Sequence, residues 1–399
     1  MSSVWTKSDA SKINLNLINT LPHFDINFPV ISDELFAWDF MPLKDLKTND
    51  IVKVDKWYVV FSLGCKKEPH IYLNEDNSYD IQSDWENRHM RASIHFWYTE
   101  GQKDSVWHYG NEVITQPNKA SWSGTPFLKG NKVQFYFTSV DNETPFITYT
   151  SLDISANNTE VIINNRSEIK TILEPDGKYY QTFVQNPYLN FRDPSPFINP
   201  EDGELYMVFE GNMAGYVGTF NIEKEDIGLV PKYFKNEPSY CSQVGCIGIA
   251  KAKDKEGNEW EMLPPLLTAK GITEQTERPH VVFKNNKVYL FTIAHKHLFN
   301  NTLTGAEGLF GFYADSLFDT YKPLNESGLV ITNPPSSTYQ AYSFYVLNNG
   351  LVLSFIDSVQ TINSDTFRIG GTVSPTIQLT INDTTTSIDD ILNYGQLLP

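Results

Sequence analysis

The chain has 399 residues, a formal net charge of −17, and an aromatic content of 14%. This acidic balance argues against a nucleic-acid-binding protein, because phosphate contacts need a basic face. It argues equally against binding to an anionic membrane surface, whereas a neutral ligand is compatible with it. No stretch reaches the roughly 20 apolar residues of a membrane span.

Residues 1 to about 30 contain Asn, Pro and Ser, and they predict an N-terminal arm packed on the body of the protein. The start, Met1 to Lys7, has neither the basic nor the apolar region of a cleavable signal peptide. Export by a route without such a peptide stays open, as does a shortened chain.

From Trp57 onward the pattern becomes short strands, rich in β-branched and aromatic residues and bounded by Gly, Asn, Asp and Pro. The predicted strands are Lys56–Ser62, Ile94–Thr99, Lys132–Ser139, Leu205–Phe209, Val288–Ile293, Leu309–Tyr313 and Leu351–Ile356. Long amphipathic helices are not apparent. A short helix is predicted at Asp389–Tyr394.

Many short strands without βαβ alternation predict an all-β sandwich, barrel or propeller. No break in composition divides residues 1–399, so we expect a single domain. Five propeller blades of about 70 residues would fill the chain. A propeller also suits three acidic motifs at positions 39, 193 and 277, because innermost strands of different blades converge on one channel. The repeat signature of the WD40 type is missing.

One stretch in the middle of the chain, Phe191–Phe197, places an Arg, an Asp and two prolines between aromatic residues. Proline restricts its own φ and pushes the preceding residue into an extended conformation. We therefore expect Arg192 and Asp193 to be held rigidly near the mouth of the following strand. Asp39 and Glu277 stand in similar settings, each close to a Pro and to an aromatic or Arg.

Cleavage of a glycosidic bond with retention needs a carboxylate nucleophile and a carboxylic acid that protonates the leaving oxygen. Asp39, beside Trp38, suits the nucleophile. Glu277 suits the acid/base, because its neighbours could tune and position it. Asp193 is flanked by Arg192, which can bind hydroxyls and help keep the carboxylate ionised. Each acid alone is more often a turn or surface residue, but three in such settings predict one sugar-cleaving site.

Eight short motifs resemble, in the same order, those of bacterial levansucrases and inulosucrases. They are Trp38–Leu43, Trp122–Pro126, Phe191–Pro194, Val208–Asn212, Glu274–Pro279, Leu290–His295, Tyr342–Ser343 and Ser354–Ser358. The likeness runs from about residue 35 to about residue 375. It is closest to the Gram-negative-type branch, in which a His, here His295, replaces an Arg.

This resemblance implies a five-bladed β-propeller with a deep, acidic central pocket. It implies that Asp39 attacks C2 of the fructosyl unit of sucrose. Glu277 would protonate the departing glucose and then deprotonate the acceptor, and Asp193 would stabilise the transition state. The remaining implied roles are the fructosyl subsite (Trp38, Trp122 and Arg192), a hydrogen bond to the nucleophile (Ser123), the glucose or acceptor side (Glu274, Arg278, His295 and Tyr342) and a supporting position (Glu210).

Structural alternatives exist for several of these residues. Trp38 and Trp122 could be core tryptophans, and His295 and His297 could merely cap a strand. We predict no metal, because no third ligand stands at a recognised spacing from these histidines, and no cofactor. Three cysteines are too few for a disulfide framework, although a Cys241–Cys246 bridge is possible.

The sequence thus predicts a fructosyltransferase that cleaves sucrose, releases glucose and transfers fructose to fructan, sucrose or water. The nearest rival is a β-fructofuranosidase, with the same acids and water as the dominant acceptor. A fructan-binding propeller lectin without activity is a more distant rival. We expect a secreted monomer. The sequence does not distinguish β-2,6 from β-2,1 linkage.

Overall fold

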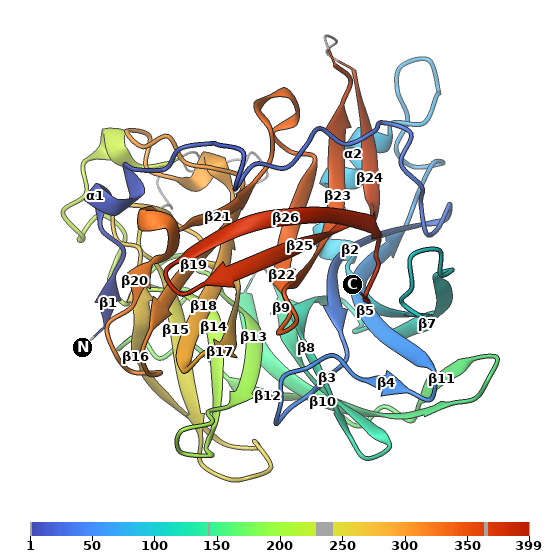
Figure 1. The fold of residues 1–399 in the computed structure, drawn as a ribbon, viewed down its shortest axis with the longest axis horizontal. Helices are drawn as coiled ribbons and strands as arrows, with labels where there is room; N and C mark the ends of the chain where they lie inside the picture. The colour runs from blue at the N-terminus through green and yellow to red at the C-terminus, as the bar shows by residue number, and fades with distance from the viewer. Residues whose placement is uncertain (1, 143, 229–241, 363–365, 399) are drawn as a thin grey trace.

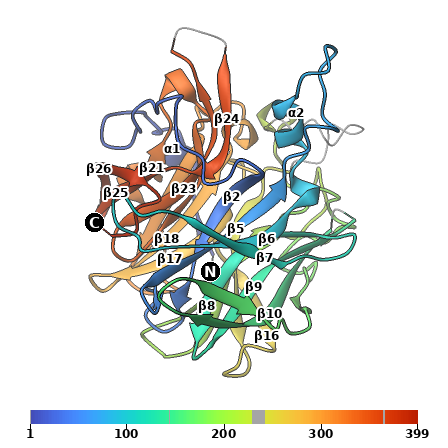
Figure 2. The same ribbon diagram turned by 90° about the vertical axis from the view of Figure 1, so that its right-hand side faces the viewer.

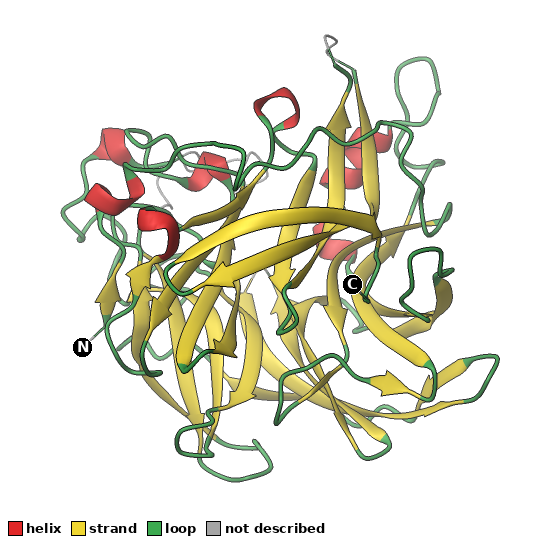
Figure 3. Ribbon diagram, in the orientation of Figure 1, coloured by secondary structure: helices red, strands yellow, loops and turns green. Residues whose placement is uncertain are grey.

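The computed structural model describes residues 2–142, 144–228, 242–362 and 366–398. Its strands form five sheets, which confirms the all-β prediction. Figure 1 shows the chain passing from blue strands on the right, through green and yellow ones, to orange and red ones. Strands make up most of the structure, and the short helices lie toward the upper side in Figure 3.

The sheets follow one another along the chain, and each adds short strands at an edge. The first contains β2 (Leu35–Pro42), β5 (Trp57–Lys66), β6 (Ser93–Thr99), β7 (His108–Ile114) and β4 (Lys53–Val54). The second contains β8 (Ala120–Lys129), β9 (Lys132–Asp141), β10 (Thr144–Ala156), β11 (Val161–Asn164), β12 (Lys170–Leu173) and β3 (Lys44–Asp45). The third contains β13 (Phe191–Ile198), β14 (Leu205–Asn212), β15 (Gly245–Ala252), β16 (Trp260–Thr268) and β1 (Ser3–Val4).

The last two sheets complete the set. The fourth contains β17 (Glu277–Lys284), β18 (Lys287–Ala294), β19 (Gly308–Ala314), β20 (Lys322–Pro323) and β21 (Leu329–Thr332). The fifth contains β22 (Ala341–Val346), β23 (Leu351–Gln360), β24 (Phe367–Val373), β25 (Pro375–Asn382) and β26 (Thr385–Tyr394). Each of the seven predicted strands lies on an observed one.

The first long strand of each sheet lies at the centre of the arrangement. These strands contact one another in a closed ring, in the order β2, β8, β13, β17, β22 and back to β2. The second strands are buried along their length, as β14 and β18 show, because neighbouring sheets cover both of their faces. The five sheets are the blades of a five-bladed β-propeller, as predicted.

Helices are short and lie in the connections. They are α1 (Lys7–Ala10), α2 (Ile81–Glu86) and the 3₁₀ turns η1 (His89–Arg91), η2 (Lys224–Asp226), η3 (Lys296–Leu298), η4 (Leu324–Glu326) and η5 (Pro335–Ser337). Among the described residues, no helix has the length and apolar character needed to cross a bilayer.

The predicted helix at Asp389–Tyr394 is wrong, because these residues belong to strand β26. A helix of six residues is marginal in water. As a strand, the segment pairs with β25, for example Ile391 with Ile377, and its half-buried apolar side chains pack on the core. Figure 1 shows β25 and β26 crossing in front of the other strands.

Phe191–Phe197 also differs from its prediction, since it forms strand β13 itself instead of preceding one. Pro194 and Pro196 are tolerated because β13 is an end strand of its sheet, where the missing N–H groups break few ladder bonds. Pro194 lies within an irregularity of pairing between Arg192 and Ser195.

The thiols of Cys65 and Cys246 are buried and free. Because the Cys246 thiol is free, the possible bridge to Cys241, a residue outside the described ranges, is not formed.

The N-terminal segment is attached to the propeller. Strand β1 pairs in parallel with β16, and Thr20 bridges to Thr332. Trp5 is only 1% exposed, packs against Phe310 and donates its indole N–H to the Ser327 carbonyl over 3.0 Å.

We expect Trp5→Ala to lower the free energy of unfolding by about 3–5 kcal/mol, the usual cost of removing a large buried aromatic side chain. Leu17→Ala, at a position that is 95% exposed, is the matched control and should change stability by less than about 0.5 kcal/mol. Urea denaturation measures both. Equal effects would show that the segment is not part of the cooperative fold.

Candidate active site

A β-bulge interrupts the first long strand of every blade. The irregularities fall between Trp38 and Met41, Trp122 and Gly124, Arg192 and Ser195, Glu277 and His280, and Tyr342 and Tyr345. Bulges re-aim side chains and are common next to active sites. In β8 the bulge requires glycine, because a Cβ on Gly124 would lie 1.9 Å from the Tyr136 carbonyl oxygen.

The residue at the start of each bulge lines one pocket of about 850 Å³. These five residues are Trp38, Trp122, Arg192, Glu277 and Tyr342. In four blades the next residue has a left-handed backbone, with φ of 51° at Asp39, 59° at Asp193, 44° at Arg278 and 61° at Ser343. Such strain in non-glycine residues persists where the surroundings enforce it, often at functional sites. A β-bulge at the same place in each blade therefore directs a side chain from every blade into the pocket.

The structure brings ten of the twelve predicted site residues to this pocket. They are Trp38, Asp39, Trp122, Ser123, Arg192, Asp193, Glu277, Arg278, His295 and Tyr342. The volume lies toward the upper end of the roughly 300–1,000 Å³ typical of small-ligand sites. Six carboxylic acids line it, namely Asp39, Glu86, Asp193, Glu277, Glu307 and Asp357, against three arginines.

Asp39 is held from the neighbouring blade. The Ser123 hydroxyl donates a hydrogen bond to Asp39 Oδ2, as the sequence resemblance implied. Trp38, which is 2% exposed, and Trp122 add aromatic walls beside this carboxylate.

Asp193 is buried and lies close to both other acids. Its Oδ2 accepts the backbone N–H of Arg278 over 3.0 Å. Burial raises the pKa of Asp193 to about 6, the Glu277 and Asp39 carboxylates add to this rise, and the Arg192 guanidinium opposes it. The three acids thus share one electrostatic environment.

Glu277 is oriented by donors on both of its oxygens. Arg192 Nη2 donates to Oε1 over 2.9 Å, and the Tyr342 hydroxyl donates to Oε2 over 2.5 Å. Arg192 also donates from Nε to Glu210 Oε2 over 2.6 Å. Burial raises the pKa of the Glu210 carboxyl to about 8, against the opposing effect of Arg192. Glu210 itself is fully buried and lies outside the pocket lining.

Two of the predicted site residues use their charged groups for contacts within the fold. Arg278 directs its guanidinium to the Ser343 hydroxyl, over 2.6 Å, and to the Phe40 carbonyl, over 2.9 Å. It thereby ties the central strands of three blades together. Glu274 does not line the pocket. Its fully buried carboxylate accepts the backbone N–H groups of Ser242 and Gln243, which anchors that segment.

Burial raises the pKa of Glu274 to about 8, and the backbone donors only partly oppose this. An unfolded Glu has a pKa near 4.3, so the folded chain binds the extra proton and stability falls as pH rises toward 8. We expect Glu274→Gln to flatten the decline in unfolding free energy between pH 6.5 and 8. Glu256→Gln, at an exposed position, should leave the slope unchanged. Parallel slopes for wild type and Glu274→Gln would contradict this.

Sequence reasoning missed one wall of the pocket. Figure 2 shows α2 and β24 projecting from the same end of the molecule, and the two elements are in contact. Here the Arg88 guanidinium stacks on Trp85 at 3.5 Å and approaches Asp357 Oδ2 at 4.0 Å. Residues 88 and 357 lie far apart in the sequence, so no local motif reveals that they are in contact.

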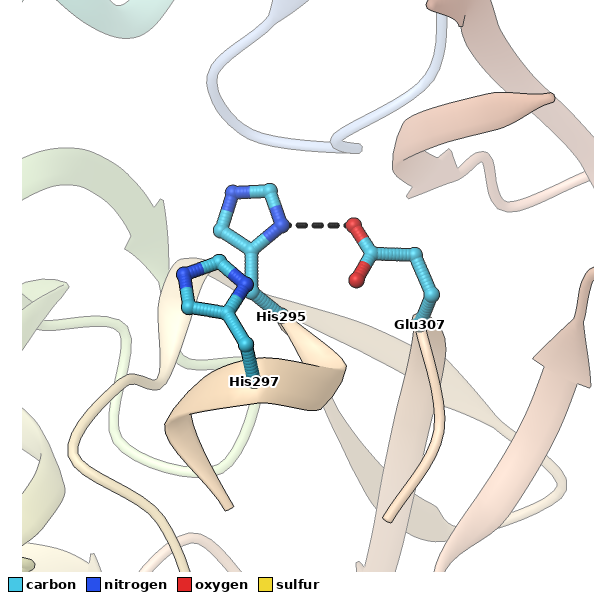
Figure 4. A group of neighbouring side chains, drawn as sticks. All are labelled: His295, His297 and Glu307. Carbon is cyan, nitrogen blue, oxygen red and sulfur yellow. Dashed lines mark hydrogen bonds and ion pairs between the residues drawn. The ribbon is translucent and has the colours of Figure 1, made fainter. Parts of the chain in front are cut away.

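Glu307 is another pocket residue that sequence reasoning missed. It lies between two glycines just before β19, a setting that marks a turn but gives no hint of a site. Figure 4 shows its carboxylate directed at His295, with His297 next to that histidine, and the three side chains offer ligand atoms within 4.8 Å of one another. A third potential ligand therefore exists where the sequence showed none.

The geometry of this group is that of a hydrogen bond. His295 Nδ1 and Glu307 Oε1 are 2.5 Å apart. Two ligands bound tetrahedrally to one zinc ion at about 2.0–2.1 Å would stand about 3.3 Å apart. A charge-assisted hydrogen bond accounts for the shorter contact. We therefore assign no metal to these residues.

Comparison with known proteins identifies the arrangement. The family model described as levansucrase/invertase matches residues 1–398. A levansucrase of Rahnella aquatilis is 45% identical, over 100% of this chain and 96% of that protein. The crystal structure of levansucrase from Gluconacetobacter diazotrophicus has a TM-score of 0.83 at 30% identity, covering 100% of this chain and 93% of that one. A β-fructofuranosidase from Microbacterium saccharophilum has a TM-score of 0.85 at 30% identity, covering 100% and 86%.

The match extends over the whole chain and confirms the resemblance found in the sequence motifs. The chain therefore belongs to the levansucrase/invertase family, glycoside hydrolase family 68, and is a sucrose fructosyltransferase of the levansucrase type.

Proposed function

We propose that Asp39, Glu277 and Asp193 cleave sucrose by retaining double displacement through a fructosyl–Asp39 intermediate. The observation that carries this proposal is the convergence of the three acids, from three different blades, on one pocket. Each occupies or adjoins a bulge that fixes its direction, and each carboxylate has a hydrogen-bond donor from another blade.

In the first step an oxygen of Asp39 attacks C2 of the fructosyl unit, and the bond between C2 and the glucosyl oxygen breaks. Glu277 gives its proton to that oxygen, so glucose leaves and Glu277 becomes a carboxylate. Ser123 keeps Asp39 aimed at C2. Asp193 holds fructosyl hydroxyls and stabilises the positive charge that develops on the ring.

In the second step Glu277 takes the proton of an acceptor hydroxyl, and the acceptor oxygen attacks C2. The ester bond between C2 and Asp39 breaks, which restores both acids. A fructan or sucrose acceptor gives transfer, and water gives hydrolysis. Trp38, Trp122 and Arg192 enclose the fructosyl unit, while His295 and Tyr342 face the glucosyl or acceptor sugar.

Incubation of the purified protein with sucrose tests this function directly, with free glucose and free fructose followed over time. Transfer releases more glucose than fructose. Equal release would indicate the hydrolase, a second candidate favoured by the likeness to the Microbacterium β-fructofuranosidase. Release of neither sugar would contradict both.

We further propose that the enzyme works outside the cell, as a monomer in which residues 1–399 form one catalytic unit. A large polar fructan made inside the cell would remain there, because polar groups are costly to bring into a bilayer. Activity in culture supernatant, compared with lysed cells, tests the location. Light scattering on a sizing column tests the oligomeric state.

A further inference from the structure

Glu307 is engaged entirely with the turn that carries His295. It is 3% exposed, and its Oε1 contacts His295 Nδ1 at 2.5 Å. Its Oε2 accepts the backbone N–H of Lys296 over 2.9 Å. Both oxygens thus hold the start of η3 in place. The carboxylate lines the pocket beside this turn. Figure 4 shows the contact between Glu307 and His295.

His295 is fixed on a second side by stacking. Its ring lies 4.0 Å from that of Tyr342, with an angle of 14° between the planes. The same tyrosine donates its hydroxyl hydrogen to Glu277 Oε2. His295 Nε2 lies 3.8 Å from this oxygen, too far for a direct hydrogen bond. The ring therefore faces the proposed acid/base, and its Nε2 makes no direct hydrogen bond to that carboxyl group.

We propose that Glu307 is a positioning residue for fructosyl transfer, which holds His295 as a cation with its Nε2–H directed at the sugar beside Glu277. The proposal rests on the acid/base role proposed for Glu277. In the first step Glu277 loses its proton and becomes an anion. A cation 3.8 Å away stabilises that anion, and its N–H can bind a hydroxyl of the leaving or accepting sugar.

The carboxylates around His295 favour the protonated, positively charged form of its imidazole ring. Burial alone would lower the pKa of His295, but the carboxylates of Glu307, Glu277 and Asp357 outweigh it and raise the pKa to about 9. These acids face the ring from three elements, the turn before β19, strand β17 and strand β23. The other titratable neighbours include His297, whose pKa burial lowers to about 4, His89, whose pKa burial lowers well below its usual value, and the hydroxyl of Tyr342.

The test is the pH dependence of kcat/KM for sucrose cleavage in wild type, Glu307→Gln and Glu307→Asp. Gln keeps a hydrogen-bond acceptor but removes the charge. We expect the alkaline limb of the profile to move down by at least about one pH unit in Glu307→Gln, lowering kcat/KM at least about twofold at pH 8 and more at higher pH. Glu307→Asp, which restores the charge, should recover part of the shift. An unmoved limb in folded Glu307→Gln would overturn the proposal.

A matched control separates the positioning of His295 by Glu307 from a general effect on stability. Asp84 is another fully buried acid, paired with Arg91 and outside the pocket lining. Asp84→Asn and Glu307→Gln should both lower the melting temperature, but Asp84→Asn should not move the alkaline limb. A similar movement of the limb in both variants would assign the effect to general loosening and overturn the proposal.

Histidine NMR on the wild-type protein keeps the proposal testable if Glu307→Gln fails to fold. In protein with ¹³C-labelled imidazoles, the signal that His295→Gln removes should titrate near pH 9. Titration at or below the ordinary histidine value of about 6.5 would overturn the proposal. This measurement needs no sucrose. Failure of the proposed function would appear separately, as activity that survives in Asp39→Ala.

Discussion

Asp39→Ala should abolish both glucose release and fructosyl transfer, lowering kcat by about 10⁴-fold or more. In the proposed mechanism Asp39 forms the covalent bond through which both outcomes pass, so hydrolysis and transfer must fall together. Sucrose binding should survive, because Trp38, Trp122 and Arg192 remain in place. Initial rates from coupled glucose assays and calorimetric titration with sucrose measure the two effects.

The control is Asp315→Ala, which removes an acid whose side chain is 79% exposed and pairs with Lys287. Its kcat should stay within about twofold of wild type. Ser123→Ala provides a graded comparison, since it removes only the hydrogen bond that aims Asp39. An Asp39→Ala variant that cleaves sucrose at even one-tenth of the wild-type rate would exclude Asp39 as the nucleophile.

The intermediate itself can be trapped with Glu277→Ala. A fructosyl fluoride donor suits this variant, because fluoride leaves without needing a proton, whereas an acceptor still needs the missing base. We expect the peptide containing Asp39 to gain the mass of one hexosyl unit in rapid-quench mass spectrometry. Labelling on Asp193 instead would exchange the proposed roles of the two aspartates.

The three proposed catalytic acids could be predicted because each of them stands in a short local motif. Asp39, Asp193 and Glu277 each stand beside Pro and an aromatic or Arg, in motifs whose order matches one family. The sequence did not show why these neighbours recur. The structure explains them by a bulge in the central strand of each blade, which depends on pairing with the next strand and leaves no repeat in the residue types.

The errors arose where side-chain direction or distant partners decide the role. Glu274 was placed at the pocket because it belongs to a motif shared with the family, yet its carboxyl group accepts the backbone N–H groups of Ser242 and Gln243. Arg88 meets Asp357 only because the ring of blades closes. Glu307 acts through His295, and a single acid between glycines carries no signal of such a contact.

Arg192 pairs with the proposed acid/base Glu277 and with the buried Glu210. Its removal should therefore lower both the stability and the activity of the enzyme. Its side chain is 13% exposed and bridges Glu210, which is fully buried, to Glu277. Arg192→Ala leaves a buried carboxylate without its cation, which should lower the unfolding free energy by about 3–5 kcal/mol. Arg192→Lys should also fail to restore activity, because one ammonium cannot reproduce the planar fork that serves both acids.

Two further variants separate the expected loss of stability from the expected loss of activity. Arg166→Ala removes an exposed arginine bonded to the Thr115 carbonyl and should change stability by less than about 0.5 kcal/mol. The double variant Arg192→Met with Glu210→Gln removes both buried charges and should regain much of the lost stability without regaining kcat. Urea denaturation and sucrose cleavage, measured on the same preparations, distinguish these outcomes. Wild-type kcat in the stable double variant would show that Arg192 serves the fold alone, and that Tyr342 suffices to orient Glu277.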